Sequence, residues 1–459
     1  MTEPAKVGIR DSVKELGWPK TLLLGFQHMF AMFGATILVP ILLSGKEYFD
    51  LKEVPVQVTL FFAGINTLLF HLFTKFKVPA FLGSSFAFLG GFSTVAKLNS
   101  GIYAGLSGEE KLAYACGGIV VAGSLYLILA LIVKMVGMKR VIRFLPPVVT
   151  GPIIILIGLS LAPSAVMSAS TNWYLAATAL AIIIVCNIWG KGMIKILPIL
   201  LGVVGSYCVA LVCHFSGLTN PDGSVILKFA EASRYASQGI SGFVSLPKYA
   251  IAKFDIQSIM IMAPIAIATI IELIGNISSI SATVGENLFE DPGLERELIG
   301  DGLASSISGF FGGPPCTTYG ENTSVLELSK VYDTKVVRIA ACYAIILSFC
   351  PVFAQLIGSV PASIIGGVSF ILYGMISAIG IRNLVENRVD FTNSRNLIIA
   401  ALILVTGLGF KFWNIQNGQA IDGVTFQIFG TQITLTALAL ASIVGVAANA
   451  ILPETKKEQ

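Results

Sequence analysis

The chain has 459 residues, of which 55% are hydrophobic and 12% are charged, and its mean hydropathy is +0.82. A soluble domain carries about 25% charged residues, so this composition excludes a water-exposed surface over most of the chain. The formal net charge of +4 is small and spread over loops, which excludes a basic patch for nucleic acid. The composition predicts an integral membrane protein surrounded by the lipid bilayer.

Fourteen apolar segments follow one another along the chain. They lie at 21–44, 54–74, 83–97, 114–137, 145–163, 172–190, 195–215, 257–282, 295–312, 321–330, 335–357, 361–379, 394–411 and 431–452. A helix needs about 20 apolar residues to cross the hydrocarbon, so the third and tenth are too short to cross alone. Each of these two follows a Pro-containing stretch. The pattern predicts an all-α polytopic membrane protein with extended stretches before half-helices 3 and 10.

The positions of Lys and Arg predict the orientation. With fourteen spans both termini lie on one side, and 21 of the 30 Lys and Arg residues then fall in the segments of that side. Cytoplasmic segments carry such an excess. We therefore expect a multi-pass protein of the cell (plasma or inner) membrane with both termini cytoplasmic, and the polar start at 1–20 reads as a cytoplasmic lead-in rather than a signal peptide.

Two pairs of short motifs indicate an internal repeat. The run at 146–151 resembles the run at 361–366, and the run at 83–86 resembles 318–321, about 235 residues later. Two halves of seven spans each must have opposite orientations. Transporters built from inverted repeats bind their substrate near the midplane, where interrupted helices meet. The pattern predicts a carrier of a small solute.

Glu272 stands out because it lies within an apolar span with no basic residue near it in sequence. A carboxylate there is costly unless it faces a cavity or gains a proton. Asn276 follows one turn later on the same helix face. Glu272 is therefore a candidate for proton coupling, with a buried glutamate satisfied by neighbouring helices as the alternative.

Glu321 lies at the expected start of the tenth segment. Pro314 and Pro315 disfavour helix upstream, so the helix should begin around 321–323, with its free N–H groups directed at the site. Glu321 could also act only as a capping residue. Glu327, further along, is interpreted as structural or exposed.

The first-half counterpart is the run at 84–86. Small residues such as Ser85 let backbone N–H groups approach a ligand, and Phe86 offers a ring face, although ordinary packing is an equal alternative. His28 follows Gln27 in the first span, where a polar pair must find partners in other helices or in the substrate. Tyr373 is expected to be buried, either bonded to protein or lining the site.

These residues carry a resemblance to a known family. The runs at 27–36, 79–88, 272–276, 291–294 and 317–322 resemble the nucleobase–ascorbate transporter family, and within it the bacterial uracil permeases, over residues 15 to 450. The resemblance implies uracil taken up together with a proton. It implies binding carboxylates at Glu272 and Glu321, backbone contacts at Phe86 and Gly320, and flanking tyrosines at Tyr319 and Tyr373.

The resemblance also implies a domain division and a homodimer formed through the gate domains. The implied division is a tail at 1–20, a core domain at 21–137 and 257–357 (spans 1–4 and 8–11), a gate domain at 138–256 and 358–452 (spans 5–7 and 12–14), and a tail at 453–459. Uracil permeases similar to this chain often carry a histidine or aspartate where Asn276 stands. Asn cannot titrate, so a proton role must rest on Glu272 or on another group such as His28.

Several other functions remain open. One alternative is a transporter of the same family that carries xanthine or a broader range of nucleobases instead of uracil. An anion carrier of the related sulfate-permease architecture would need a basic residue near the broken helices, and none occurs between 314 and 329. A channel would not need substrate-specific carboxylates. An enzyme is least expected, because no nucleophile–base set and no metal-ligand spacing are present, and no cofactor is expected.

Overall fold

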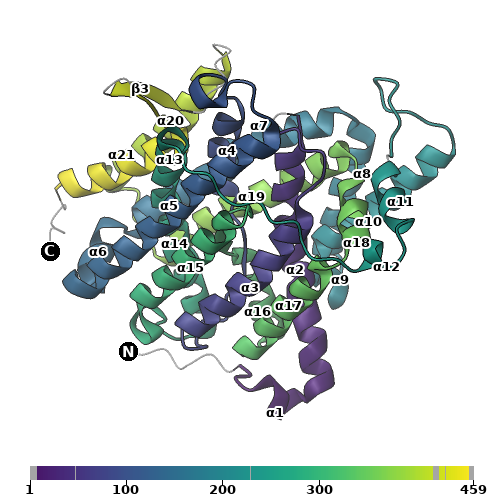
Figure 1. The fold of residues 1–459 in the computed structure, drawn as a ribbon. Coiled ribbons are helices and arrows are strands. Elements are labelled where there is room, and N and C mark those ends of the chain that lie inside the picture. Colours follow the sequence, from purple (N-terminus) through teal and green to yellow (C-terminus); the bar gives the residue numbers. More distant parts are fainter. Residues whose placement is uncertain (1–7, 47, 228, 417–422, 429–430, 454–459) are drawn as a thin grey trace.

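The computed structural model describes residues 8–46, 48–227, 229–416, 423–428 and 431–453, and it is mainly helical (Figure 1). Among these residues, eight long apolar helices could cross a membrane. They are α2 (Trp18–Ser44), α3 (Val56–Phe73), α5 (Gly108–Val136), α7 (Pro147–Ser170), α10 (Pro198–Phe215), α13 and α14 (Ile256–Met262 and Ala266–Val284, joined by η3, Ala263–Ile265), α19 (Ala362–Glu386) and α20 (Ser394–Gln416).

A ninth candidate span is broken in the middle. The expected segment 335–357 consists of α17 (Thr334–Ser348) and α18 (Pro351–Gly358), which meet at an angle of 89°. Pro351 is the first residue of α18, where its missing N–H is tolerated and its ring prevents α17 from continuing. The expected segment at 335–357 is therefore present, but it is bent rather than one continuous helix.

Shorter elements occupy the remaining expected segments, so the number of fourteen spans stays a prediction. These are η1 (Phe86–Phe88) with α4 (Leu89–Ala96), α8 (Trp173–Ile188), α15 (Leu294–Phe310), α16 (Gly320–Ser329) and α21 (Ala437–Ile451). The connecting elements are α1 (Ser12–Leu16), η2 (Gly101–Tyr103), α6 (Met138–Phe144), α9 (Met193–Ile196), α11 (Ala230–Ala236), α12 (Ile240–Phe243) and η4 (Phe289–Gly293).

The expected extended stretches are two short strands that pair with each other. β1 (Leu82–Ser84) and β2 (Cys316–Thr318) run antiparallel, with Gly83 opposite Thr317. All six residues are buried. The backbone groups of these interrupted helices are therefore partly satisfied by pairing inside the protein, which is the condition for non-helical backbone at membrane depth.

A second strand pair corrects the last predicted segment. Residues 431–435 form β4 (Thr431–Leu435), which pairs antiparallel with β3 (Val424–Ile428), and helix α21 begins only at Ala437. Six of the ten residues in these two strands are β-branched, which favours strand here over helix. The apolar content alone had suggested one helix across 431–452.

The helices pack in two groups. The α15 group comprises α2 to α5 and α13 to α18, where α15 lies along α5 and α3, and α17 lies along α3 and α2 (Figure 1). The α19 group comprises α7, α8, α10 and α19 to α21. The groups meet where α14 contacts α7, α19 and α21, and where α2 contacts α10. This grouping follows the expected core and gate division, which remains a prediction.

The two echoing motifs begin helices that pack on each other. α7 and α19 lie in extensive contact, with the Asn383 amide donating to Thr150 Oγ1 at 2.7 Å and Ser377 Oγ donating to the Ile155 carbonyl at 3.0 Å. A Cβ on Gly380 would lie 2.6 Å from the carbonyl oxygen of Gly151. Glycine is therefore required for this close approach.

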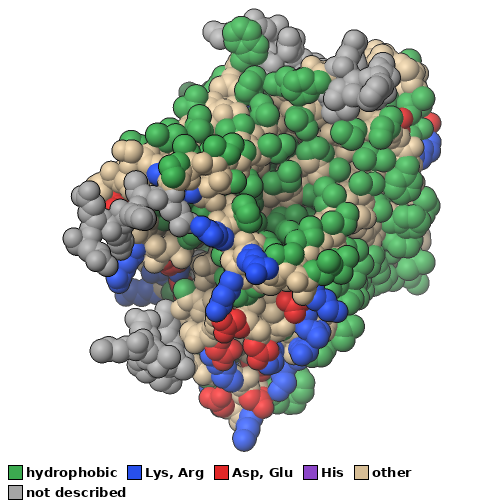
Figure 2. Space-filling view, turned by 90° about the vertical axis from the view of Figure 1, so that its left-hand side faces the viewer, with side chains coloured by type: hydrophobic (Ala, Val, Ile, Leu, Met, Phe, Trp, Pro, Cys, Tyr) green, Lys and Arg blue, Asp and Glu red, His purple; other side chains and the backbone are tan. Residues whose placement is uncertain are grey.

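Hydrophobic side chains cover most of the surface that Figure 2 shows, and charged side chains gather toward its lower end. Large apolar side chains are strongly exposed, among them Met135, Tyr174 and Val405. An apolar surface of this extent is typical of a protein face that contacts lipid. It agrees with the membrane assignment made from composition.

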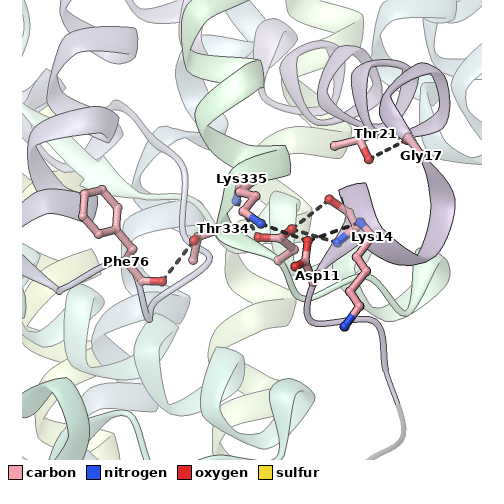
Figure 3. A network of polar contacts seen from close by, with 9 residues as sticks. Asp11, Lys14, Gly17, Thr21, Phe76, Thr334 and Lys335 are labelled. Carbon is pink, nitrogen blue, oxygen red and sulfur yellow. Dashed lines mark hydrogen bonds and ion pairs between the residues drawn. The ribbon is translucent and has the colours of Figure 1, made fainter.

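The N-terminal segment is bonded to the loop that follows α16. Ser12 donates to Asp333 from both its N–H and its hydroxyl, at 2.9 and 2.8 Å, and Lys335 Nζ pairs with Asp11 at 2.9 Å (Figure 3). Thr334 Oγ1 donates to the Phe76 carbonyl at 3.0 Å. The N-terminus, the 74–77 turn and the start of α17 thus lie on one face of the protein.

A second polar network lies on the segment that joins α10 to α13. Glu53, in the loop before α3, accepts from Lys248 Nζ at 2.8 Å, from Arg234 at 3.2 Å and from the Tyr235 hydroxyl at 2.9 Å. Burial raises the pKa of Glu53, but the hydrogen bonds from Lys248 and Tyr235 and the nearby positive charges outweigh burial, so its pKa lies below the ordinary value. Glu53 therefore holds residues 234–248 on the α15 group.

We expect Glu53→Gln to increase hydrogen–deuterium exchange of residues 233–249 at pH 7, because the charge that orders them is lost. In the unsubstituted protein the lowered pKa of Glu53 means that this stabilisation is complete above its ordinary value of about 4.5 and is lost as pH falls through the lowered value. In the unsubstituted protein, the exchange of residues 233–249, normalised to the intrinsic rate at each pH, should therefore be the same at pH 7 and at pH 5.5. Glu109→Gln, at an exposed carboxylate nearby, is the control, and equal exchange in both variants would contradict the role of Glu53.

Candidate functional site

Two half-helices begin at the paired strands in the interior. The Ser85 N–H donates to the Pro315 carbonyl and the Tyr319 N–H donates to the Phe81 carbonyl, both at 2.9 Å. Because β1 and β2 run antiparallel, the helices that follow them leave in opposite directions. η1 begins at Phe86 and α16 at Gly320. Two helix N-termini, each with free N–H groups, therefore meet at this point.

Tyr319 lies across the strand pair and supports it. Its buried hydroxyl donates to the Ser84 carbonyl at 2.8 Å, and Ser84 Oγ donates to the Thr36 carbonyl of α2 at 2.9 Å. A Cβ on Gly83 would lie 2.4 Å from the Tyr319 ring, so only glycine fits beneath it. The side chain of Tyr319, expected to flank the site, thus bonds β1, and Ser84 in turn bonds β1 to α2.

Asn276 attaches α14 to the second strand. Its side chain is 3% exposed, and its amide donates to the Thr318 carbonyl at 2.6 Å and to Thr318 Oγ1 at 3.3 Å. Glu272 is half-buried one turn earlier on α14. The bond from Asn276 therefore fixes the height of Glu272 relative to the start of α16, two residues after Thr318.

The first turn of α16 carries the second predicted carboxylate. The backbone of Glu321 lies in this turn, and its side chain lies outside the part of the chain that the structure describes. Asn322, the next residue, donates to the His28 carbonyl at 3.2 Å, and its Nδ2 lies 3.3 Å from His28 Nδ1. His28 is fully buried on α2. The structure therefore brings the His28 region to the start of α16.

Phe86 and Tyr373 meet across the boundary between the helix groups. Their rings form an edge-on pair with centroids 5.8 Å apart, and they are 5% and 3% exposed. A cavity of about 20 Å³ beside Phe86, lined also by Leu156 and Ser160 of α7, has room for about one water. Phe86 therefore borders both the Tyr373 ring of α19 and this small cavity against α7 and α20.

Several buried polar atoms near these helix starts have no protein partner within the described residues. They are Ser85 Oγ, Thr317 Oγ1, Thr323 Oγ1, Asn322 Oδ1 and His28 Nε2. A buried polar atom without a hydrogen bond costs about 1–3 kcal/mol, so such a cluster favours a small polar ligand or bound water. Thr317, Asn322 and Thr323 were not predicted as site residues, although the polar run at 317–324 within an apolar region was the signal that could have found them.

The predicted site residues therefore come from five parts of the fold. Ser85 and Phe86 lie at η1, Tyr319, Gly320 and the Glu321 backbone at α16, Glu272 and Asn276 on α14, Tyr373 on α19 and His28 on α2. In the described ranges no group of three or more His, Cys, Asp or Glu side chains is placed to hold a metal ion. The arrangement can offer backbone N–H donors, hydroxyl and amide groups and a carboxyl group to a planar polar molecule beside an aromatic ring.

Comparison with known proteins connects this arrangement to a family. A model described as "Permease family" matches residues 19–416. The uracil permease of Bacillus caldolyticus is 38% identical over 441 residues, which are 94% of this chain and 92% of that protein. The putative pyrimidine permease RutG of Escherichia coli K12 is 35% identical over 444 residues, covering 96% and 94% of the two chains.

Solved structures share the fold at low sequence identity. The transmembrane domain of the cyanobacterial bicarbonate transporter BicA superposes with a TM-score of 0.54 at 14% identity, over 97% of this chain and 100% of that chain. The murine anion transporter Slc26a9 gives 0.58 at 10% identity, over 94% and 67%. At these identities the likeness concerns the fold alone.

We expect Asn276→Ala to lower the free energy of unfolding by about 1–3 kcal/mol, because the buried Thr318 carbonyl loses the shortest bond that holds it to α14. Denaturation of the purified protein in detergent, followed by circular dichroism, measures the change.

The matched control is Asn396→Ala, which removes an amide that donates to the Asp390 carbonyl at an exposed position, where water replaces the bond. Equal losses in the two variants would contradict a special role for the bond between α14 and β2.

Proposed function

The chain belongs to the permease family whose model it matches over residues 19–416, and on that premise we propose that it is a uracil:proton symporter that imports uracil by alternating access. The family assignment confirms the resemblance found in the sequence. Its relatives are permeases rather than enzymes, and the chain is a multi-pass membrane protein.

The site supports a small planar polar substrate. The observation that carries this proposal is the meeting of two half-helix N-termini at Phe86 and Gly320, among buried polar atoms and beside the Phe86–Tyr373 ring pair. Uracil is neutral and has two N–H donors and two carbonyl acceptors. Its carbonyls can accept from the backbone N–H groups, and its N–H groups can donate to the carboxyl and hydroxyl oxygens. The relatives named uracil permease, at 34–38% identity, favour uracil within this class.

We assign roles to the site residues accordingly. Glu321 accepts from one ring N–H, and Glu272 accepts from the other or, when protonated, donates to a carbonyl. Backbone N–H groups near Phe86 and Gly320, with Ser85 beside them, meet the remaining oxygen. Each charge-assisted bond contributes about 1.5–3 kcal/mol. Tyr373 and Phe86 enclose the ring, and Tyr319 supports the strand pair through its hydroxyl.

Proton coupling rests on Glu272 in this proposal. A half-buried carboxyl group on α14 can cross the membrane field more easily when neutral, so uracil and a proton would load together. Asn276 contributes by positioning, since its amide donates to Thr318 and cannot titrate. His28, buried beside Asn322, is a second candidate for proton transfer.

Alternating access needs two bodies that move relative to each other. The α15 group corresponds to a core domain at 21–137 and 257–357, and the α19 group to a gate domain at 138–256 and 358–452. The site lies largely on the first group, and Tyr373 contributes from the second. We place the protein in the cell membrane with both termini cytoplasmic, as a homodimer formed through the gate domains.

Two other kinds of carrier are compatible with the fold, one for xanthine or other nucleobases and one for anions. A xanthine or broader nucleobase carrier would use the same site, and competition of labelled uracil uptake by xanthine separates the two. An anion carrier has the support of the fold shared with BicA and Slc26a9. The run at 314–329 contains no Lys or Arg, which favours a neutral substrate.

Uptake of labelled uracil into proteoliposomes, with and without an inward proton gradient, tests the proposed function. We expect saturable uptake that rises above equilibrium only with the gradient, and competition by unlabelled uracil but not by xanthine. Uptake without saturation, or uptake indifferent to the gradient, would contradict symport.

We expect Glu272→Gln to abolish gradient-driven accumulation, because a permanently neutral side chain cannot bind and release a proton. Exchange of internal for external uracil should persist, since that process needs no net proton transfer. Counterflow in the same proteoliposomes measures the exchange, and gradient-driven accumulation by the variant would refute the assignment.

We expect Glu321→Ala to weaken uracil binding by about 10- to 150-fold, the equivalent of one charge-assisted hydrogen bond of 1.5–3 kcal/mol. Isothermal titration of purified protein measures the affinity. Glu286→Ala, at a carboxylate beyond the end of α14 that pairs with Arg10, is the control. Unchanged affinity in the Glu321 variant would overturn its role.

A further inference from the structure

An ion pair connects the two helix groups beyond the site. The Arg382 guanidinium of α19 pairs with Glu327 Oε1 of α16, and the same oxygen accepts from Thr283 Oγ1 of α14 at 3.2 Å. Arg382 also bonds Glu386 at 2.6 Å, one turn along its own helix. Glu327 is thus attached to two helices, and the bond to Arg382 is the one that crosses the group boundary.

The ion pair lies to one side of the site. Glu327 follows Glu321 by six residues on α16, and Arg382 follows Tyr373 by nine residues on α19. At a rise of about 1.5 Å per residue, Glu327 lies roughly 9 Å beyond Glu321 along α16, and Arg382 lies roughly 14 Å beyond Tyr373 along α19. Both helices run in this direction toward the face that carries the N-terminal segment and the loop at 330–335.

Closer to the site, the two helix groups touch through glycine. A Cβ on Gly320 would lie 2.7 Å from Ile379 Cδ1, and a Cβ on Gly275 of α14 would lie 2.6 Å from Ile154 Cδ1 of α7. The boundary here consists of side-chain tips against bare backbone. Contacts of this kind are apolar and exert no directional hold, whereas the Glu327–Arg382 bond is directional.

A cavity of about 150 Å³ lies at the same boundary and is bordered by Val325 and Leu328, which precede and follow Glu327 on α16. It is lined by Phe30 of α2, by Val325 and Leu328 of α16, by Ile199 of α10 and by Met375 of α19. Val325 is 2% exposed. If the groups separated at this side, the cavity would widen toward the face that carries the N-terminal segment, and the Val325 position would become accessible.

We propose that the Glu327–Arg382 ion pair holds the cytoplasmic side of the site closed and breaks each time uracil is released inward. The inference rests on the proposed movement of core against gate. Both side chains are 37% exposed, so the pair is partly hydrated and can open readily. Glu327 and Arg382 are then positioning residues, which keep the first turn of α16 and Tyr373 in register until release.

Accessibility of residue 325 tests the proposal. Val325→Cys, a change of little volume, is treated with a membrane-impermeant maleimide in inside-out vesicles, and labelling of its peptide is followed by mass spectrometry, which separates it from the native cysteines. We expect Glu327→Gln and Arg382→Gln each to raise the labelling rate at least threefold, because loss of the bond favours the open state.

Two further variants distinguish this role from a loss of folding. Glu386→Gln removes the other partner of Arg382 without crossing the boundary and should leave the rate unchanged. The exchanged pair Glu327→Arg with Arg382→Glu should restore slow labelling, which a misfolded protein could not do. Equal rates in the Glu327 and Glu386 variants, or fast labelling in the exchanged pair, would overturn the proposal.

The labelling assay does not depend on the identity of the substrate. If the rates follow the expected order while uracil uptake is absent, the ion pair keeps its role and the proposed substrate fails. If uptake is gradient-driven while the rates do not respond to Glu327→Gln, symport stands and the closing role of the ion pair fails.

Discussion

The pairing of β1 with β2 is the constraint on which the rest of the structure depends. Within a bilayer, backbone N–H and C=O groups that leave a helix must find protein partners. Residues 82–84 and 316–318 find them in each other, although about 234 residues separate them in sequence. Only because that pairing satisfies the interrupted backbone can η1 and α16 begin in the interior, and only there can their free N–H groups face a ligand. The bond from Asn276 to Thr318 then holds β2 to α14. The bond from Tyr319 to Ser84 adds a second link between the two strands.

Local sequence signals predicted the interruption but not the partner. Prolines at 314 and 315 and the short apolar runs at 83–97 and 321–330 indicated extended chain before two half-helices, and the structure confirms it. The local sequence could not show that the two stretches pair, because three residues are too few to identify a partner strand elsewhere in the chain. Two other segments differ from the expectation because apolar content alone defined them. It did not register the β-branched residues that favour the hairpin of β3 and β4, or the Pro351 at which the segment 335–357 bends.

The site residues show a related limit. A polar side chain in an apolar span must have a partner, but the sequence does not say whether the partner is protein or ligand. Tyr319 was expected beside the substrate and Asn276 beside the proton-coupling Glu272, and the structure engages their side chains with Ser84 and Thr318. Phe86 and Tyr373 were separate candidates, and the fold brings their rings together from different helix groups. Conversely, Glu321 was predicted as a site residue, whereas its neighbours Asn322 and Thr323 were not, although their buried oxygens lie at the same helix start.

The contrast between contacts within and between the helix groups bears on movement. Within the α19 group, α7 and α19 are joined by the Asn383–Thr150 and Ser377–Ile155 hydrogen bonds and by backbone contact at Gly380, which favours motion as one body. Between the groups, Gly320 and Gly275 face the flexible ends of isoleucine side chains. Sliding such a surface breaks few directional bonds, so a half-exposed ion pair of modest strength can decide which position is preferred. A boundary that is apolar near the proposed site and bonded farther out therefore places control of the proposed movement away from the residues proposed to bind the substrate.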